Sequence, residues 1–263
     1  MGTVKPKKQL GQHFLKDKLI AKKIVDSFLT VFDGDLAIEI GPGTGVLTDY
    51  LINLRDLNFK ALDVDKESID YLHKKYPDHA SEVLFEDFLK TNLIGQFDRV
   101  GVIGNFPYNI SSQIFFKIYE EKDRVQLIVG MLQKEVAERI CAKPRNKTYG
   151  ILSVLLQAFY EVEYLFTVTP EVFDPPPKVM SAVVRLQRNE TEELDCDHKL
   201  FKRVVKEGFQ KRRKTLRNAL KIFDLSKELT AERVFSQRAE ELSVAEFVEL
   251  TKKIEADGRN NAV

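Results

Sequence analysis

Short apolar runs rich in β-branched residues recur along the first two thirds of the chain, and amphipathic stretches separate them. The runs that predict strands are residues 36–40, 59–64, 83–85, 100–103, 125–131, 162–168 and 182–186. Strands that alternate with helices are typical of a parallel sheet covered by helices. The pattern therefore predicts an α/β fold built on a seven-stranded sheet.

Helical spacing of apolar residues predicts helices at residues 16–32, 135–142 and 151–160. Residues 189–197 contain several acidic residues without a clear period, which is typical of a linker. Beyond them the pattern is helical, and it places these apolar residues on inner faces: Phe201, Val204, Val205, Phe209, Leu216 and Leu220. We therefore predict a first domain at residues 1–188 and a small all-helical domain at residues 198–263.

Composition indicates an ordinary cytoplasmic protein. Hydrophobic residues make up 43% of the chain and charged residues 31%. No apolar run approaches the roughly 18 residues that a membrane span needs, and no apolar stretch of the signal-peptide kind follows the charged N-terminus. The two cysteines, Cys141 and Cys196, lack zinc-like spacing, so free thiols and no metal are expected. A monomer is the default expectation.

A net charge of +1 hides two basic segments. The first contains Lys5, Lys7, Lys8, Lys16, Lys18, Lys22 and Lys23. The second contains Lys199, Lys202, Arg203, Lys206, Lys211, Arg212, Arg213, Lys214 and Arg217. Such clusters can neutralise the phosphates of a nucleic acid, although a solvated helix face is an equally good interpretation of either segment alone.

A glycine-rich loop, Glu-Ile-Gly-Pro-Gly-Thr-Gly at residues 39–45, follows the first predicted strand and opens a helix. Gly41 and Gly43 lie in a Gly-x-Gly-x-Gly spacing, whereas a dinucleotide loop that holds pyrophosphate requires Gly-x-Gly-x-x-Gly. The departure favours S-adenosylmethionine, which has no phosphate. Asp63 ends the second strand, where it can bind ribose hydroxyls, and Asp87 can hold the adenine amino group. The alternative is a glycine turn with ordinary surface acids.

The tetrad Asn-Phe-Pro-Tyr at residues 105–108 follows another predicted strand. The exocyclic amine of adenine is a poor nucleophile, because its lone pair is delocalised into the ring. The Asn105 side chain and the Phe106 carbonyl can accept hydrogen bonds from both amine protons, which favours a pyramidal nitrogen in the transition state. Pro107 restricts the turn, and Tyr108 offers a face for stacking. A plain turn at the end of a strand is the alternative.

Seven segments, in order, resemble the bacterial small-subunit ribosomal RNA adenine dimethyltransferases over nearly the whole chain. They are KQLGQHFL at residues 8–15, EIGPGTGVLT at 39–48, NFPYNISS at 105–112, QKEVAER at 133–139, YGILS at 149–153, FDPPPKVMS at 173–181 and FQKRRKTLRN at 209–218. The resemblance implies a Rossmann-like class I methyltransferase sheet, mostly parallel with the last strand antiparallel.

The resemblance also implies the reaction and the substrate. It implies transfer of methyl groups from S-adenosylmethionine to N6 of two adjacent adenines, in a hairpin near the 3′ end of 16S ribosomal RNA. The partner would be the immature small ribosomal subunit, late in its assembly.

Roles of single residues follow from the same resemblance. His13 and Leu15 would close over the cofactor, and Asn105 would bridge the cofactor and substrate sites. Phe173 would help Tyr108 to sandwich the target adenine. The residues expected along RNA phosphates are Lys211, Arg212, Arg213, Lys214 and Arg217.

The chain departs from the family pattern at a few positions. His13 stands where Asn is frequent, Asp63 where Glu is common, and Phe106 where Leu is frequent. Three alternative functions stay open at this stage. They are methylation of large-subunit RNA, a ribosome-assembly factor that acts mainly by binding, and methylation of adenine in DNA.

Overall fold

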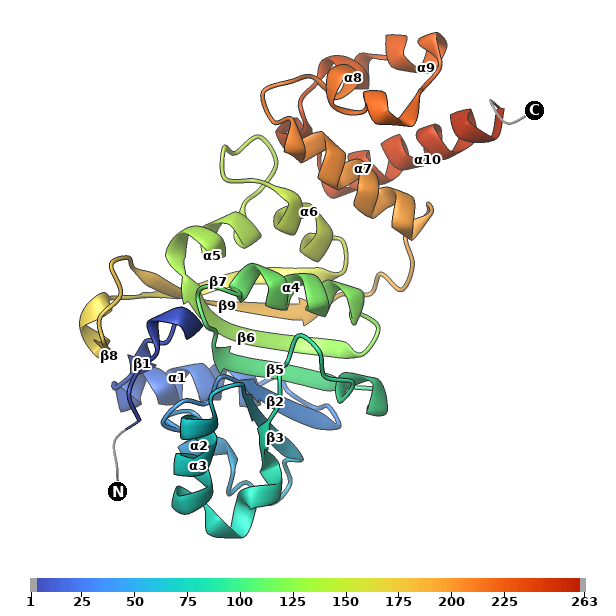
Figure 1. Ribbon diagram of the computed structural model, residues 1–263. Helices are drawn as coiled ribbons and strands as arrows, with labels where there is room; N and C mark the ends of the chain where they lie inside the picture. The colour runs from blue at the N-terminus through green and yellow to red at the C-terminus, as the bar shows by residue number, and fades with distance from the viewer. Residues whose placement is uncertain (1–3, 261–263) are drawn as a thin grey trace. The chain divides into compact units, whose positions relative to one another are not determined.

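The computed structural model describes residues 4–260, which form two compact units (Figure 1). The first, here called the sheet unit, comprises Met1–Ala137 and Glu161–Arg188. The second, here called the helical unit, comprises Glu138–Tyr160 and Asn189–Val263. Residues 138–160 thus group with the C-terminal helices, although they lie inside the predicted first domain. The division into domains at residues 1–188 and 198–263 stays a prediction.

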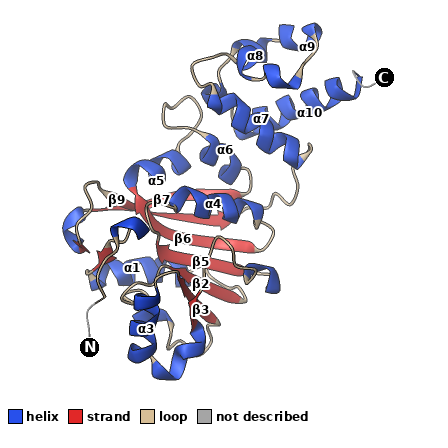
Figure 2. Ribbon diagram, viewed as in Figure 1, coloured by secondary structure: helices blue, strands red, loops and turns tan. Residues whose placement is uncertain are grey.

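One sheet forms the centre of the sheet unit, and its strands lie side by side in Figure 2. Its strands are β2 (Leu36–Ile40), β3 (Phe59–Asp63), β4 (Val83–Phe85), β5 (Val100–Asn105), β6 (Val125–Gln133), β7 (Tyr160–Val168) and β9 (Ser181–Arg188). Their order is β4-β3-β2-β5-β6-β9-β7. The strands from β4 to β6 pair in parallel, whereas β9 runs antiparallel to β6. This confirms the predicted seven-stranded, mostly parallel sheet with its last strand antiparallel.

The strand order reverses direction between β4 and β5. The chain passes from β2 outward through β3 to β4, and then crosses back to place β5 on the other side of β2. In open parallel sheets, ligands bind beyond the carboxyl ends of the strands at such a switch point. The glycine loop after β2 and the tetrad at the end of β5 therefore flank the expected position of a site.

Two further strands escape the sequence pattern. β1 (Phe14–Leu15) and β8 (Phe173–Asp174) pair antiparallel, with Leu15 opposite Phe173. Each strand has only two residues, which is too short for any alternation of apolar and polar positions to show. Their pairing holds the N-terminal segment against a loop that is far away in the sequence.

The helices that begin in the sheet unit are α1 (Lys18–Leu29), α2 (Thr48–Leu51), α3 (Lys66–Lys75), α4 (Ser111–Glu120) and α5 (Lys134–Cys141). Asp17 caps α1, because its carboxylate accepts the backbone N–H groups of Leu19 at 2.8 Å and Ile20 at 3.1 Å. The buried face of α1 carries Ile24 and Phe28, while Leu19 is 80% exposed. Leu19 lies well off the buried stripe, about 140° from Ile24 around the helix axis.

The helical unit contains α6 (Ile151–Gln157), α7 (His198–Gln210), α8 (Leu216–Ala219), α9 (Lys227–Ala231) and α10 (Val244–Asn260). All the apolar residues predicted for inner faces after residue 198 are buried. Phe209 of α7 packs between Tyr149 and Phe247, with ring centroids 6.0 and 5.9 Å away. The predicted helix at residues 151–160 is too long, because Tyr160 already begins β7.

Short 3₁₀ helices complete the described chain. In the sheet unit they are Lys8–Leu10, Pro77–Glu82, Ile94–Gln96 and Pro170–Val172, and in the helical unit Lys221–Phe223, Arg233–Ser236 and Ala239–Glu241. Among residues 4–260, no helix has the length and apolar character to cross a membrane.

Candidate active site

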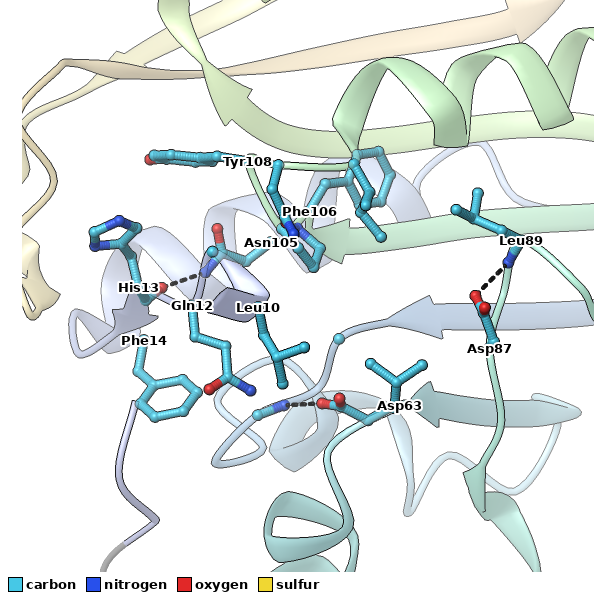
Figure 3. Close-up of a pocket in the computed structure, with 17 residues that line it drawn as sticks. Leu10, Gln12, His13, Phe14, Asp63, Asp87, Leu89, Asn105, Phe106 and Tyr108 are labelled. Carbon is cyan, nitrogen blue, oxygen red and sulfur yellow. Dashed lines mark hydrogen bonds between the residues drawn. The ribbon is translucent and has the colours of Figure 1, made fainter. Parts of the chain in front are cut away.

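A cavity opens at the carboxyl ends of β2, β3 and β5, where the strand order reverses (Figure 3). It is lined by Leu10, Gly11, Gln12, His13, Phe14, Gly41, Gly43, Asp63, Val64, Asp87, Leu89, Asn105, Phe106, Pro107, Tyr108, Asn109 and Ile110. The glycine loop and the tetrad, which the sequence singles out separately, thus share one cavity. Residues 10–14 of the N-terminal segment contribute one wall.

The glycine loop forms a turn that other residues could adopt only with strain. Gly41 has φ +66° and Gly43 φ +55°, both in the left-handed region. A Cβ atom at Gly43 would lie 2.8 Å from the Phe14 ring, so a side chain there would also displace that ring. The helix after the loop, α2, has only four residues. The main chain can therefore approach a ligand closely, with little helix dipole to attract phosphate.

A buried acid, Glu39, lies at the start of this loop. Glu39 is fully buried at the end of β2, and Thr48 Oγ1 donates to its Oε2 at 2.7 Å. Burial raises the pKa of Glu39 to about 8, against the lowering effect of that hydrogen bond. At neutral pH, Glu39 therefore stays mostly uncharged, which limits the negative charge next to Asp63.

Asp63 lies at the end of β3 with its carboxylate in the cavity. The backbone N–H of Asp65 donates to Asp63 Oδ1 at 2.9 Å, and that of Gly43 donates to Oδ2 at 3.4 Å. Burial raises the pKa of Asp63 to about 6, although these hydrogen bonds act to lower it. Asp63 is thus mainly ionised at pH 7 and titrates slightly below it.

Asp87 forms a second acidic group in the cavity, after β4. Its Oδ1 accepts the backbone N–H of Leu89 at 3.0 Å, and its Oδ2 lies 3.4 Å from Lys90 Nζ. The turn at residues 87–91 orients the carboxylate, so an acceptor is available for a donor group of a ligand.

Asn105 is oriented by the N-terminal segment. Its Nδ2 donates to the main-chain oxygen of His13 at 2.8 Å, which leaves Oδ1 as the acceptor of the amide (Figure 3). Within residues 4–260, no donor is found on that oxygen. The sequence predicts Asn105 as an acceptor, but this interaction that sets its orientation is visible only in the structure.

Phe106 anchors the tetrad in the core. Its ring is 1% exposed, packs edge-on to Phe115 at 5.9 Å, and its backbone N–H donates to Met131 at 2.9 Å. A Cβ at Gly130 would lie 2.3 Å from this ring, so β6 makes room for it. The Phe106 side chain therefore positions the tetrad, and only its main chain is left to face the cavity.

Tyr108 presents a half-buried ring. Its hydroxyl is hydrogen-bonded to Ser181 Oγ, and its ring centroid lies 5.2 Å from that of His13 at a tilt of 33°. Burial raises the pKa of Tyr108, against the hydrogen bond with Ser181. The phenol therefore stays protonated at neutral pH and offers a flat face for stacking.

His13 joins three parts of the site. Besides its contacts with Asn105 and Tyr108, its Nδ1 lies 2.7 Å from the main-chain oxygen of Pro175, which requires a protonated Nδ1. The ring thereby connects the N-terminal segment to the proline-rich loop. His13 lines the cavity, and its role in covering a bound cofactor stays a prediction.

Leu15 and Phe173 do not line this cavity. Leu15 is 3% exposed and Phe173 0%, and both lie in the hydrophobic core of the sheet unit. The structure therefore does not bring Phe173 opposite Tyr108, because the β1–β8 pairing holds it inside. A stacking role for Phe173 would require this loop to open, and it stays a prediction.

The predicted RNA-contacting residues lie on an exposed turn of the helical unit, here called the basic turn (residues 211–217). Lys211, Arg213 and Lys214 are exposed, and within residues 4–260 no ion pair or hydrogen bond holds their side chains. Arg212 instead donates to the main-chain oxygens of Lys147 and Tyr149, the latter at 3.3 Å. Arg217 Nε donates to the Thr230 oxygen at 3.0 Å.

The N-terminal basic segment is arranged differently. Lys7 pairs with Asp65 and Glu67, Lys22 pairs with Asp26 at 2.6 Å, and the Lys23 ammonium lies 3.9 Å from the centre of the Phe166 ring. Three of the seven lysine side chains therefore interact with residues of the sheet unit.

Several cavity residues are absent from the sequence-based prediction. Gln12 and Gly11 come from the N-terminal segment, and Asn109 and Ile110 follow the tetrad. Gly11 has φ +62°, and a Cβ there would lie 2.6 Å from Asn109 Oδ1. Only their membership of the quoted KQLGQHFL and NFPYNISS segments could have indicated them. Phe14, another of them, lies over the glycine loop.

A family model described as ribosomal RNA adenine dimethylase matches residues 3–256. The chain belongs to this family. A protein of Flavobacterium johnsoniae named ribosomal RNA small subunit methyltransferase A is 54% identical over 260 residues, 98% of this chain and 99% of that protein. A protein of the same name from Bacteroides thetaiotaomicron is 55% identical, over 97% of this chain and 96% of its own.

Solved structures agree with the family assignment. A dimethyladenosine transferase from Plasmodium falciparum superposes with a TM-score of 0.77 at 26% identity, covering 94% of this chain and 98% of its own. The 23S rRNA methyltransferase ErmE gives a TM-score of 0.64 at 22% identity, covering 90% and 99%, and this likeness shows the fold alone. The fold is that of a class I methyltransferase, and family membership makes the chain a methyltransferase of ribosomal RNA.

Proposed function

We propose that this protein is the S-adenosylmethionine-dependent 16S ribosomal RNA adenine N6,N6-dimethyltransferase. It transfers methyl groups to two adjacent adenines in a hairpin near the 3′ end, within an immature small subunit, as a cytoplasmic monomer. One observation carries the proposal. Asn105 lines the same cavity as the glycine loop and Asp63, and its Oδ1 is left to accept a hydrogen bond from a ligand.

The residues of the cavity fit S-adenosylmethionine. The left-handed glycines let the main chain approach a ligand, and the short α2 provides no long helix for a phosphate. Asp63, ionised at neutral pH, can accept hydrogen bonds from both ribose hydroxyls, as acidic residues do at this position of nucleotide-binding sheets. The Asp87 carboxylate can accept a hydrogen bond from the adenine amino group. Bound S-adenosylmethionine would supply a methyl carbon activated by its sulfonium.

The tetrad then acts on the target amine. In the first transfer, Asn105 Oδ1 and the Phe106 carbonyl accept hydrogen bonds from its two N–H groups, which favours the pyramidal nitrogen of the transition state over the planar ground state. The buried ring of Phe106 keeps these two acceptors in place. Tyr108 stacks on the base, a contact worth roughly 1 to 3 kcal/mol. No base is needed beforehand, because the nitrogen becomes acidic only after methylation.

The target adenine must leave its stack to reach this cavity, as in other enzymes that modify bases. The basic turn supports the RNA side of the proposal, because Lys211, Arg213 and Lys214 are exposed and unpaired within residues 4–260. Exposed cations of this kind bind phosphates without reading sequence.

Mass spectrometry of ribosomal RNA tests the reaction. Small subunits that lack the modification are incubated with the protein and isotopically labelled S-adenosylmethionine, and the RNA is digested to nucleosides and to mapped fragments. We expect two labelled N6,N6-dimethyladenosines in one fragment near the 3′ end of 16S RNA. Label in isolated 23S RNA or in DNA, with none in 16S RNA, would refute the proposal.

A role in subunit assembly can be separated from catalysis. The Asn105→Ala protein should still bind immature subunits, because the basic turn is unchanged. If it binds and delays their maturation, binding contributes to assembly independently of methylation. If neither binding nor delay occurs, the assembly role is wrong while the methylation result stands.

A further inference from the structure

Residues 7–13, here called the N-terminal strap, lie beside the cavity, and two of their side chains contact the same buried acid, Asp65. Lys7 Nζ forms an ion pair with Asp65 Oδ1, and Gln12 Nε2 donates to Asp65 Oδ2 at 3.1 Å. The backbone N–H of Lys7 donates to Gln12 Oε1 at 2.8 Å, which links the two tethered side chains. Both carboxylate oxygens of Asp65 therefore hold the strap.

The same residue also holds a carboxylate inside the cavity. Asp65 lies two residues after Asp63, and its backbone N–H donates to Asp63 Oδ1 at 2.9 Å. Its side chain caps α3, accepting the Glu67 N–H at 3.1 Å and the Ser68 hydroxyl at 3.2 Å. Any movement of residue 65 is thus shared by the strap, the start of α3 and Asp63.

Burial makes this contact strong and selective. The Asp65 side chain is 1% exposed, so its charge depends on its partners. Burial acts to raise the pKa of Asp65, but the hydrogen bonds from Lys7, Gln12 and the Glu67 N–H, together with the charge of Lys7, hold the pKa below its usual range. Lys7 also lies 3.4 Å from the more exposed Glu67 carboxylate. Because the Asp65 carboxylate is buried, loss of the Lys7 charge should cost more than loss of a pair between two exposed side chains.

The strap in turn makes contact with the catalytic tetrad. Asn105 Nδ2 donates a hydrogen bond to the main-chain oxygen of His13. Next to the tetrad, Asn109 Nδ2 donates to the main-chain oxygen of Gln9 at 3.3 Å. Hydrogen bonds, joined by short covalent segments of the chain, therefore connect Asp63 through Asp65 and the strap to Asn105. The path begins at the proposed ribose contact and ends at the proposed amine acceptor.

We propose that Asp65 is a positioning residue, which couples closure of the N-terminal strap to the orientation of the Asp63 carboxylate. The inference rests on the proposed function, since Asp63 is taken as the ribose contact. The contacts of Lys7 and Gln12 with Asp65 are here called the tie. With the tie intact, the strap is ordered before the cofactor binds, and less conformational entropy is lost on binding. Without the tie, the strap becomes ordered only when the cofactor binds, which weakens the affinity for the cofactor.

Lys7→Gln tests the tie without touching the cap of α3. Lys7→Arg keeps a charged donor and should restore the contact. Lys66→Gln is the matched control, because it removes a pair with Asp70 in which Lys66 is 73% exposed, one residue from Asp65. Asp65→Asn serves as a second variant, since Asn also caps helices well.

The first measurement is hydrogen exchange of the strap amides in ligand-free protein, which depends on no assumption about the cofactor. We expect residues 8–13 to exchange about 10-fold faster in Lys7→Gln, in line with the loss of one charge-assisted hydrogen bond. Lys7→Arg and Lys66→Gln should match the parent protein. Unchanged exchange in Lys7→Gln would overturn the tie.

The second measurement is affinity for S-adenosylhomocysteine by calorimetry, with steady-state kinetics on unmethylated small subunits. We expect about 10-fold weaker binding in Lys7→Gln, a raised KM for S-adenosylmethionine, a nearly unchanged kcat, and rescue by Lys7→Arg. Equal affinity in the parent and Lys7→Gln would sink the coupling. A parent protein that binds no S-adenosylhomocysteine would instead contradict the proposed function, and the exchange result would still judge the tie.

Discussion

The cavity of the sheet unit and the basic turn of the helical unit handle their charged and polar groups in opposite ways. In the cavity, Asp63, Asn105 and Tyr108 each have hydrogen-bond partners within the unit that restrict their orientation. On the turn, Lys211 and Lys214 project into solvent. Transition-state stabilisation requires acceptors placed to a fraction of an ångström, whereas attraction to phosphates requires only charge within reach.

The contrast predicts how each region responds to substitution. Changes in the cavity should be severe, specific to one kinetic step and insensitive to salt. Changes on the basic turn should be moderate, nearly additive and dependent on salt. The following experiments test this difference, from the largest expected effect to the smallest.

Asn105→Ala should have the largest effect. Loss of the oriented acceptor should lower kcat by about 10² to 10³, the usual result of removing one transition-state hydrogen bond. Methyl transfer to small subunits is measured at saturating substrate, at low and at raised salt. Affinity for S-adenosylhomocysteine serves as the control and should change much less, because Asp63 and the glycine loop are untouched. A kcat equal to that of the parent would remove Asn105 from the chemistry.

Replacing Lys211, Arg213 and Lys214 together by Ala should weaken RNA binding by about 10- to 100-fold at moderate salt. The slope of log K against log salt should become shallower by about 2 to 3, one unit or less for each lost phosphate contact. Binding to immature subunits is titrated over a salt series, and kcat at saturating RNA should stay near the parent value. An unaltered slope would make the basic turn a solvated surface.

Acidification should weaken cofactor binding through Asp63. Burial raises the pKa of Asp63 to about 6, so the carboxylate is ionised above this pH and protonated below it. If ribose hydroxyls donate to the ionised form, affinity for S-adenosylhomocysteine should be level above pH 7 and fall about tenfold per pH unit well below pH 6. Calorimetry across pH 5 to 8 measures this.

Asp63→Asn is the control for the pH series. It should bind weakly at every pH and lose the dependence, because the titrating group is gone. An equally steep profile in Asp63→Asn would assign the titration to another residue.

Arg212→Ala and Arg213→Ala form a matched pair within the basic turn. Arg212 holds the main-chain oxygens of Lys147 and Tyr149, so its loss should cost about 1 kcal/mol of stability, a few degrees in Tm. Arg213 has no such contact within residues 4–260, so Arg213→Ala should leave Tm nearly unchanged. Thermal unfolding followed by circular dichroism distinguishes the two. Equal Tm values would mean that the Arg212 contact is not formed in solution.

Local patterns in the chain were sufficient for the sheet and for the principal site residues. Apolar runs marked the strands of the large sheet, most clearly β2, β5 and β6, because a buried parallel strand needs a continuous apolar stretch. The glycine spacing and the tetrad lie at strand ends, and parallel strands bring their carboxyl ends to one edge. Gly41, Asp63 and Asn105 could therefore be assigned to one site before any coordinates were known.

Contacts between distant segments could not be read in this way. The two-residue pairing of β1 with β8 buries Phe173, although the family resemblance implied that its ring stacks on the target adenine. No sequence pattern singles out Asp65, yet it binds Lys7 and Gln12. Arg212 looked like its basic neighbours, yet it is committed to two carbonyl oxygens.

The physical reason for this division is the range of the interactions. Periodicity and glycine spacing reflect constraints on neighbouring residues, which are encoded within a few positions of the chain. A residue's burial, its pKa and the orientation of its amide depend on which remote atoms packing brings near it. Chain composition and motifs thus specified the chemistry available to this methyltransferase, and tertiary packing decided which side chains are free to perform it.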